Sequence, residues 1–225
     1  MVVESFSPHY QLIGTHMFIG HYALGLASRK ISNLPSLALL FIAVQLLDLI
    51  WPILVLLGIE TFHVDIGNTA LTPLSFDYYP YSHSLLMALV WGLLLGLVYY
   101  LFTKNKQGSL LLGVLVLSHW VLDFITHRPD LPLTPFSEVK VGLGLWNHSV
   151  SAIIVELGLF ALGTIFYYQS ARPQKKVAFW LLIGFFVVIH VMNIFGPPPP
   201  SVQAVAWSAN LMWLFVIWAW WIEKK

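Results

Sequence analysis

Three ionisable side chains recur at one-turn intervals in the segment Ser118 to Asp130, which ends a long apolar run. His119, Asp123 and His127 stand at positions i, i+4 and i+8. On an α-helix this spacing places all three on one slowly drifting face. Imidazole and carboxylate groups one turn apart can hold a divalent cation together. Because ionisable groups inside a membrane-type apolar run are costly, they are functional candidates by default.

The composition restricts the class of protein that can carry this segment. Of the 225 residues 58% are hydrophobic and 9% are charged, whereas a soluble domain carries roughly 25% charged residues. The chain is therefore predicted to be a polytopic membrane protein. Its net charge of +1 gives no general attraction to nucleic acid. The absence of cysteine excludes disulfides, thiolate zinc sites and cysteine nucleophiles.

The apolar segments predict an all-α fold, a polytopic transmembrane helix bundle that forms one integral-membrane domain over residues 1–225. A spanning helix needs about 20 mostly apolar residues. Six strong spans satisfy this requirement, at about 34–58, 84–103, 108–126, 148–170, 176–195 and 202–222. A weaker N-terminal helix is expected at about 11–28, and it either spans or enters only part of the way.

The basic residues predict the orientation of the bundle. Lysine and arginine cluster in alternate connections, at Arg29 and Lys30, Lys104 and Lys106, Arg172 to Lys176, and Lys224 and Lys225. An excess of these residues marks the cytoplasmic side. We therefore expect an integral protein of a bacterial inner membrane with a cytoplasmic C-terminus. The long loops 59–82 and 127–147 then lie on the outer side, and long loops often carry function.

In this topology, polar side chains from several predicted helices lie at the same depth in the membrane. The shared level lies in the outer leaflet, and the candidate ligands there are His21, Asp48, His83, His119 and Asp123. An isolated carboxylate in hydrocarbon must protonate or find a partner, and a dication is one such partner. Imidazole with carboxylate favours zinc, with iron and manganese as alternatives. A catalytic metal of this kind activates water for hydrolysis.

Three further residues are expected at the mouth of this site. His127, Arg128 and Asp130 follow the helix directly, where they can shuttle protons or bind an anion. A simpler interpretation makes each intramembrane histidine a hydrogen-bonded structural residue and Arg128 with Asp130 a local ion pair. Glu156 and His190 are interpreted as polar groups that join helices.

Several short motifs around these residues resemble one membrane family. They are Gly20-His21 at the start of a helix of small residues, Leu47-Asp48 followed by Pro52, Ser82-His83-Ser84, and Leu117-Ser118-His119 with Asp123 four residues on. Over about residues 16–135 the chain resembles the membrane-bound metal-dependent hydrolases, which include LexA-regulated inner-membrane proteins of bacteria. This resemblance implies a hydrolase in which the five candidate ligands bind metal.

The leading hypothesis is thus a membrane-embedded metal-dependent hydrolase that acts on a lipid-like ester or phosphoester. Its partners would be membrane lipid and an amphipathic or lipid-linked substrate. Two other classes stay open. The same cluster could relay protons or metal ions across the membrane, although few ionisable groups continue into the cytoplasmic half. Alternatively, the polar groups only join helices in a non-catalytic assembly protein.

Overall fold

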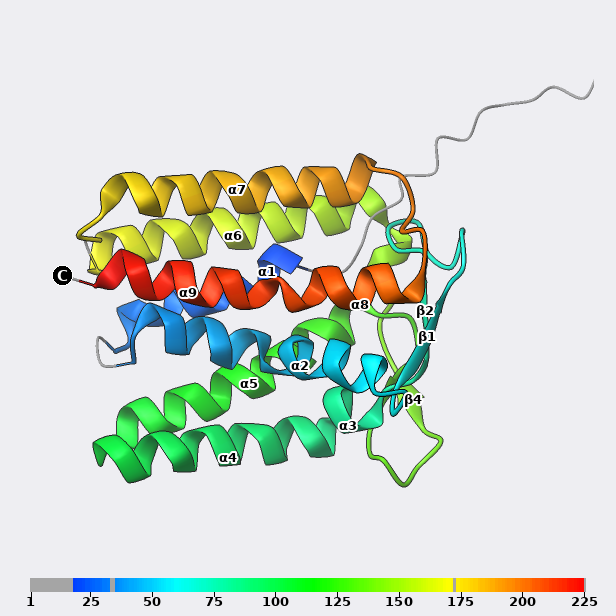
Figure 1. The fold of residues 1–225 in the computed structure, drawn as a ribbon, viewed down its shortest axis with the longest axis horizontal. Helices are drawn as coiled ribbons and strands as arrows, with labels where there is room; N and C mark the ends of the chain where they lie inside the picture. Colours follow the sequence, from blue (N-terminus) through cyan, green and yellow to red (C-terminus); the bar gives the residue numbers. More distant parts are fainter. Residues whose placement is uncertain (1–17, 33–34, 172, 225) are drawn as a thin grey trace, which may run out of the picture.

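The structure is a bundle of long apolar helices (Figure 1). A computed structural model describes residues 18–32, 35–171 and 173–224. The six helices long and apolar enough to cross a membrane are α2 (Leu37–Leu56), α4 (Leu85–Thr103), α5 (Lys106–Thr126), α6 (Ser149–Ala171), α7 (Lys176–Phe195), and the pair α8 (Val202–Asn210) and α9 (Met212–Glu223). The predicted all-α polytopic bundle is confirmed.

The N-terminal helix is described from residue 18 onward. Helix α1 covers Phe18–Ala27, ten residues, or about 15 Å of helix, against a hydrocarbon thickness of about 30 Å. The predicted segment began at residue 11, and residues 11–17 lie outside the described residues. Helix α1 packs against α6, α2 and α5, so it carries His21 inside the bundle. A short 3-10 helix, η1 (Ser28–Lys30), follows it.

Hydrogen bonds from polar side chains define where several helices begin. Ser36, Ser84, Asn105 and Ser201 each accept a hydrogen bond from the backbone N–H three residues later. Such N-caps satisfy amide groups that the first turn of a helix leaves unpaired. In hydrocarbon an unpaired amide costs several kcal/mol, so these caps matter more here than in water.

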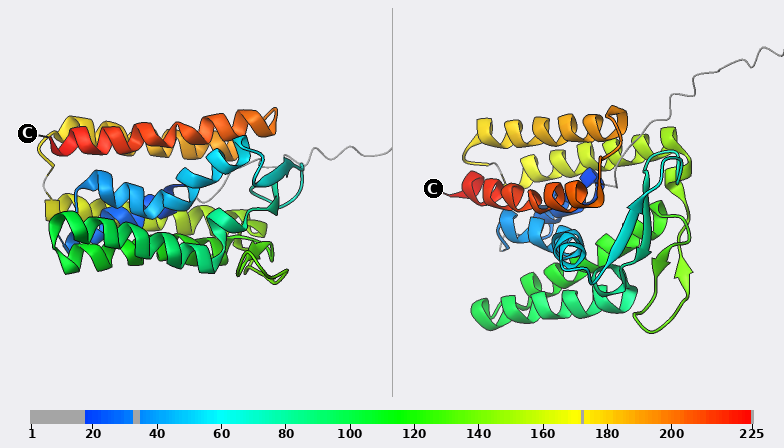
Figure 2. Two further views of the ribbon diagram at one scale, coloured as in Figure 1. Left: turned by 60° about the horizontal axis from the view of Figure 1, so that its bottom comes forward. Right: turned by 45° about the vertical axis from the view of Figure 1, so that its right-hand side comes forward.

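The two long loops fold into small hairpins at one end of the bundle (Figures 1 and 2). Strand β1 (Thr61–Val64) pairs antiparallel with β2 (Leu74–Tyr78), and β3 (Leu131–Pro132) pairs with β4 (Lys140–Val141). The one-turn helix α3 (Pro80–His83) and the 3-10 helix η2 (Leu145–Asn147) complete this end. The C-terminus lies at the opposite end. The charge rule predicts that opposite end to be cytoplasmic.

A buried ion pair ties the opposite end together. Arg29 is buried and pairs with Glu223 at the end of α9. The same carboxylate accepts hydrogen bonds from the Tyr167 hydroxyl (3.2 Å) and from the backbone N–H of Leu37 (2.7 Å). Breaking a buried pair by removing one partner is costly, because the other charge stays uncompensated. Glu223 therefore joins α9 both to η1, through Arg29, and to the start of α2, through Leu37.

A glycine allows α1 to lie directly on α6. A Cβ atom built on Gly163 would come within 2.3 Å of the carbonyl oxygen of Ala23. Because that neighbour is backbone, no side-chain rotation relieves the clash. The close approach fixes the position of α1, and with it the position of His21.

We expect Gly163→Val to lower the free energy of unfolding by about 1–3 kcal/mol through overpacking. Gly158→Val is the matched control, because it lies on the same helix and a Cβ there meets nothing within 4 Å. Thermal unfolding of both variants in detergent micelles measures the difference. Equal melting temperatures would show that α1 does not depend on this contact.

Candidate metal centre

The structure brings together all five residues that the sequence analysis proposed as metal ligands. They come from four helices, with His21 on α1, Asp48 on α2, His83 on α3, and His119 and Asp123 on α5. The donor atoms form two groups, each within 4.8 Å, one of His21, Asp48 and His119 and the other of His83, His119 and Asp123. His119 belongs to both groups and is therefore at the middle of the cluster.

Several distances between neighbouring donor atoms are those of ligands on one cation. Asp123 places Oδ1 3.2 Å from His21 Nε2 and Oδ2 3.2 Å from His119 Nε2. His83 Nε2 lies 3.3 Å from Asp48 Oδ1. Ligands bonded to zinc at 2.0–2.1 Å in a tetrahedron are about 3.3–3.4 Å apart. The longer separation between His119 Nε2 and Asp48 Oδ2, 3.7 Å, requires only a small adjustment.

Hydrogen bonds fix which nitrogen of two imidazoles can bind a cation. His119 Nδ1 donates to the backbone carbonyl of Val44 at 2.7 Å. His83 Nδ1 donates to the Ser82 hydroxyl at 2.7 Å. In the neutral ring the other nitrogen, Nε2, then carries a lone pair. Metal-bound histidines show this same outer hydrogen bond.

The carboxylates therefore face lone pairs of the two imidazoles. A carboxylate oxygen and an unprotonated Nε2 are both acceptors, so they repel each other at 3.2–3.3 Å unless a proton or a cation lies between them. Within the described residues, His21 Nδ1, His119 Nε2 and Asp123 Oδ2 are buried without a hydrogen-bond partner. Such groups are rare in folded proteins and call for an unrecorded water, ion or function.

A carboxylate outside the cluster holds His83 in place. Ser82 donates its hydroxyl hydrogen to Glu60 Oε2 at 2.6 Å, and the backbone N–H groups of Tyr81 and Ser82 both donate to Oε1 at 2.8 Å. Burial raises the pKa of Glu60, and the hydrogen bonds from Ser82 and Tyr81 oppose that increase. The sequence analysis treated Glu60 only as an acidic loop residue. Its separation of 22 residues from Ser82 gave no local signal.

The rings of His21 and His119 stack, which orders the inner side of the cluster. Their centroids lie 3.7 Å apart and their planes differ by 5°. The stack joins the short α1 to α5 through side chains that also contact Asp123. This arrangement requires α1 to enter the bundle.

Of the three residues expected at the mouth of the site, His127 lies beside the cluster, and Asp130 contacts both His127 and Arg128. His127 lines a cavity of about 10 Å³ together with His21, Asp48, His83 and Asp123, room for about one water molecule or ion. Two aromatic side chains, Trp51 and Phe76, also line it. The sequence analysis interpreted aromatic residues as interfacial or packing groups and did not place these two at the site.

A second hydrogen-bonded pair stands at this cavity. His127 Nδ1 donates to Asp130 Oδ1 at 2.9 Å, and Tyr79 donates its hydroxyl to the same oxygen at 3.2 Å. Arg128 Nε donates to Asp130 Oδ2 at 3.2 Å. Burial raises the pKa of Asp130, but the contacts with His127 and Arg128 outweigh burial and lower that pKa below its usual value. Asp130 is therefore ionised at neutral pH and orients His127.

The short β3–β4 hairpin supports the backbone of His127. The carbonyl of His127 accepts a hydrogen bond from Gly144 N at 2.7 Å. A Cβ atom on Gly142 would lie 2.4 Å from the same carbonyl oxygen, so only glycine permits this close approach. Trp146 then packs on the imidazole, with ring centroids 4.4 Å apart. The loop predicted at 127–147 thus forms one wall of the site.

Two other buried polar residues stay apart from this centre. Glu156 on α6 and His190 on α7 approach to 3.6 Å. Both are buried, and neither belongs to the two groups of donor atoms. The interpretation that they join helices stays a prediction.

Ser82→Ala should lower the free energy of unfolding by about 1–3 kcal/mol, because it leaves His83 Nδ1 and Glu60 Oε2 buried without their partner. Ser118→Ala is the control, since the Ser118 hydroxyl donates only within its own helix, to Leu115 O at 2.7 Å. Chemical unfolding in micelles compares the two variants. A loss no larger than that of Ser118→Ala would show that the Glu60–Ser82–His83 connection does not stabilise the site.

Comparison with known proteins corrects the family suggested by the short motifs. A family model, that of the YdjM inner membrane protein, matches residues 12–196. No curated protein and no solved structure matches the chain. The resemblance to the membrane-bound metal-dependent hydrolases was therefore the wrong assignment, since the matching family is described only as an inner membrane protein. With its six long apolar helices, the chain is an integral inner-membrane protein and belongs to the YdjM inner membrane protein family.

Proposed function

We propose that this protein is a membrane-embedded metal-dependent hydrolase that acts on a lipid-like ester or phosphoester. The observation that carries the proposal is the contact between His119 Nε2 and Asp123 Oδ2. The two atoms are 3.2 Å apart, and within the described chain neither has a hydrogen-bond partner. The Val44 carbonyl fixes the proton of His119 on Nδ1, so a divalent cation is the partner that suits both atoms.

The charge of the cluster supports the same proposal. Asp48 and Asp123 together carry two negative charges when ionised, and three imidazoles surround them. A single divalent cation would make this group neutral, which greatly lowers the cost of placing it in a low-dielectric region. Zinc suits nitrogen and carboxylate ligands best, with iron or manganese as alternatives. When bound, such an ion supplies Lewis acidity and activates water.

His127 and its neighbours fit the role of proton transfer. With Nδ1–H donating to Asp130, the neutral ring presents Nε2 as a base, and the ring lines the small cavity beside the ligands. The ionised Asp130 also stabilises the imidazolium that forms when His127 accepts a proton. The side chain of Arg128 is 39% exposed, so it can bind an anionic part of a substrate.

The position of the centre favours an amphipathic substrate. Its residues lie on helices of the bundle, and Phe76 of the β1–β2 hairpin lines the same small cavity. A lipid can reach such a position with its tail in hydrocarbon while its ester or phosphoester lies at the polar cluster. For a water-soluble substrate, the apolar helices around the centre would offer few polar contacts on the way to the cluster.

Protein purified without a chelator and without a His tag should contain about one equivalent of metal by elemental analysis. Asp123→Ala should remove it, because Asp123 contacts both His21 and His119 and loss of a ligand costs at least 10–100-fold in affinity. Glu156→Gln is the control, a buried carboxylate outside the cluster. Metal retained after removal of both His119 and Asp123 would overturn the proposal.

His127→Ala should lower kcat by about 10²–10⁴-fold, the usual contribution of a general base, while the metal content stays unchanged. Turnover would be followed with vesicles containing phospholipid esters and lipid-linked phosphates. His63→Ala is the control, since the side chain of His63 is exposed on β1 and pairs with Asp77. Unchanged kcat in His127→Ala would remove this residue from the mechanism. Metal-ion uptake by vesicles without hydrolysis would instead indicate translocation.

A further inference from the structure

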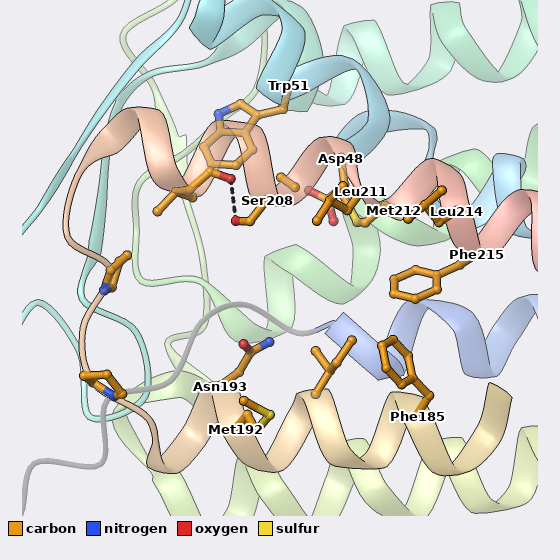
Figure 3. A pocket seen from close by; sticks show the side chains of 15 residues that line it. Asp48, Trp51, Phe185, Met192, Asn193, Ser208, Leu211, Met212, Leu214 and Phe215 are labelled. Carbon is orange, nitrogen blue, oxygen red and sulfur yellow. Dashed lines mark hydrogen bonds between the residues drawn. The ribbon is translucent and has the colours of Figure 1, made fainter. Parts of the chain in front are cut away.

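A large apolar cavity adjoins the candidate metal centre. It has a volume of about 420 Å³ and lies between α2, α7 and the α8–α9 segment (Figure 3). Its walls are mainly aliphatic and aromatic side chains, among them Phe185, Met192, Met212 and Phe215. Cavities of this size and composition are typical of sites for small apolar ligands.

The apolar cavity and the small polar cavity share two residues. Asp48 and Trp51 line both of them. Asp48 contributes one carboxylate oxygen close to His83 and the other close to His119, and its side chain is 18% exposed. Figure 3 shows this carboxylate among the lining side chains of α9. An amphipathic molecule in the apolar cavity would therefore have its polar end at the cluster.

A proline of α2 lies one turn after the residue at which the two cavities meet. Pro52 lies inside α2 and has no N–H to donate to the carbonyl of Asp48, four residues earlier. Asp48 borders both spaces at this turn. The other polar groups on the wall, Asn193 and Ser208, lie nearer to the Pro-rich connection between α7 and α8.

We propose that the apolar cavity binds one hydrocarbon chain of a membrane lipid, with the head group of that lipid at the His/Asp cluster. The assignment of the head group rests on the proposed function, whereas chain binding can be tested by itself. The lining side chains belong to membrane-spanning helices, so lipid tails are the molecules present around them.

The test uses the full chain in vesicles of phosphatidylethanolamine and phosphatidylglycerol that contain a phospholipid with a diazirine in one acyl chain. After irradiation, mass spectrometry of peptides locates the adducts, and hydrolysis is measured on the same preparation. We expect adducts on the cavity-facing residues of α7 and α9, such as Ile189 and Met212. Exposed residues elsewhere in the spans, such as Ile154 and Leu162, should carry fewer adducts than these cavity residues.

Ala209→Phe places a phenyl ring in the cavity from α8. A lipid chain could then enter only by overpacking the space, so the cavity adducts should fall about tenfold. Val188→Phe is the control, since Val188 is exposed on α7 and does not line the cavity. If Ala209→Phe fails to fold, Ser208→Phe at an exposed lining position replaces it. Adducts spread evenly over the lipid-facing residues, and unchanged by both variants, would overturn the proposal.

The same experiment separates this inference from the proposed function. Adducts confined to the cavity support chain binding, and their presence without any hydrolysis would reject the hydrolase alone. Hydrolysis with evenly spread adducts would reject the chain site alone. Lipid-facing residues that are labelled while the cavity residues carry no adducts would overturn the inference, because the cavity then holds no lipid chain.

Discussion

The central constraint on the structure is the negative charge of two carboxylates, those of Asp48 and Asp123, which lie among apolar helices. A charged group in hydrocarbon costs several kcal/mol unless it is paired, and the imidazoles of His21, His83 and His119 supply polar partners around Asp48 and Asp123. This compensation needs side chains from separate parts of the chain, so the cluster also constrains how the helices pack. The short α1 illustrates the constraint, because its place inside the bundle brings His21 to the cluster.

Several hydrogen bonds around the cluster orient the imidazole rings of His83 and His119. The Val44 carbonyl and the Glu60–Ser82 pair each fix a proton on the outer nitrogen of an imidazole. These contacts leave both Nε2 atoms facing carboxylates, an arrangement that is unfavourable without a cation or extra protons. A cluster that only joined helices would gain more from hydrogen bonds that alternate donors and acceptors. The observed hydrogen bonds thus favour a bound ion over a purely structural network.

The sequence predicted the spans well because their signal is local. Apolar runs of about 20 residues identify membrane helices, and the spacing of His119 and Asp123 identifies one face of α5. Residues whose role depends on tertiary contacts were harder to assign. Glu60 acts on His83 through Ser82, Trp51 and Phe76 line the cavity, and no local pattern marks them. The short motifs also led to the wrong family, because a histidine or an aspartate beside a few small or apolar residues is too little sequence to distinguish one membrane family from another.

The two cavities divide the site by chemical character. Asp48 and Trp51 form the boundary between a polar space of about 10 Å³ and an apolar one of about 420 Å³. On the polar side, His127 and Asp130 can move a proton, and the hairpin at Gly142 and Gly144 holds their backbone. On the apolar side, α7 and α9 offer mainly contacts suited to hydrocarbon, with Asn193 of α7 as a polar exception. A molecule that contacts both sides must be amphipathic, which is the physical reason for proposing a lipid as the ligand.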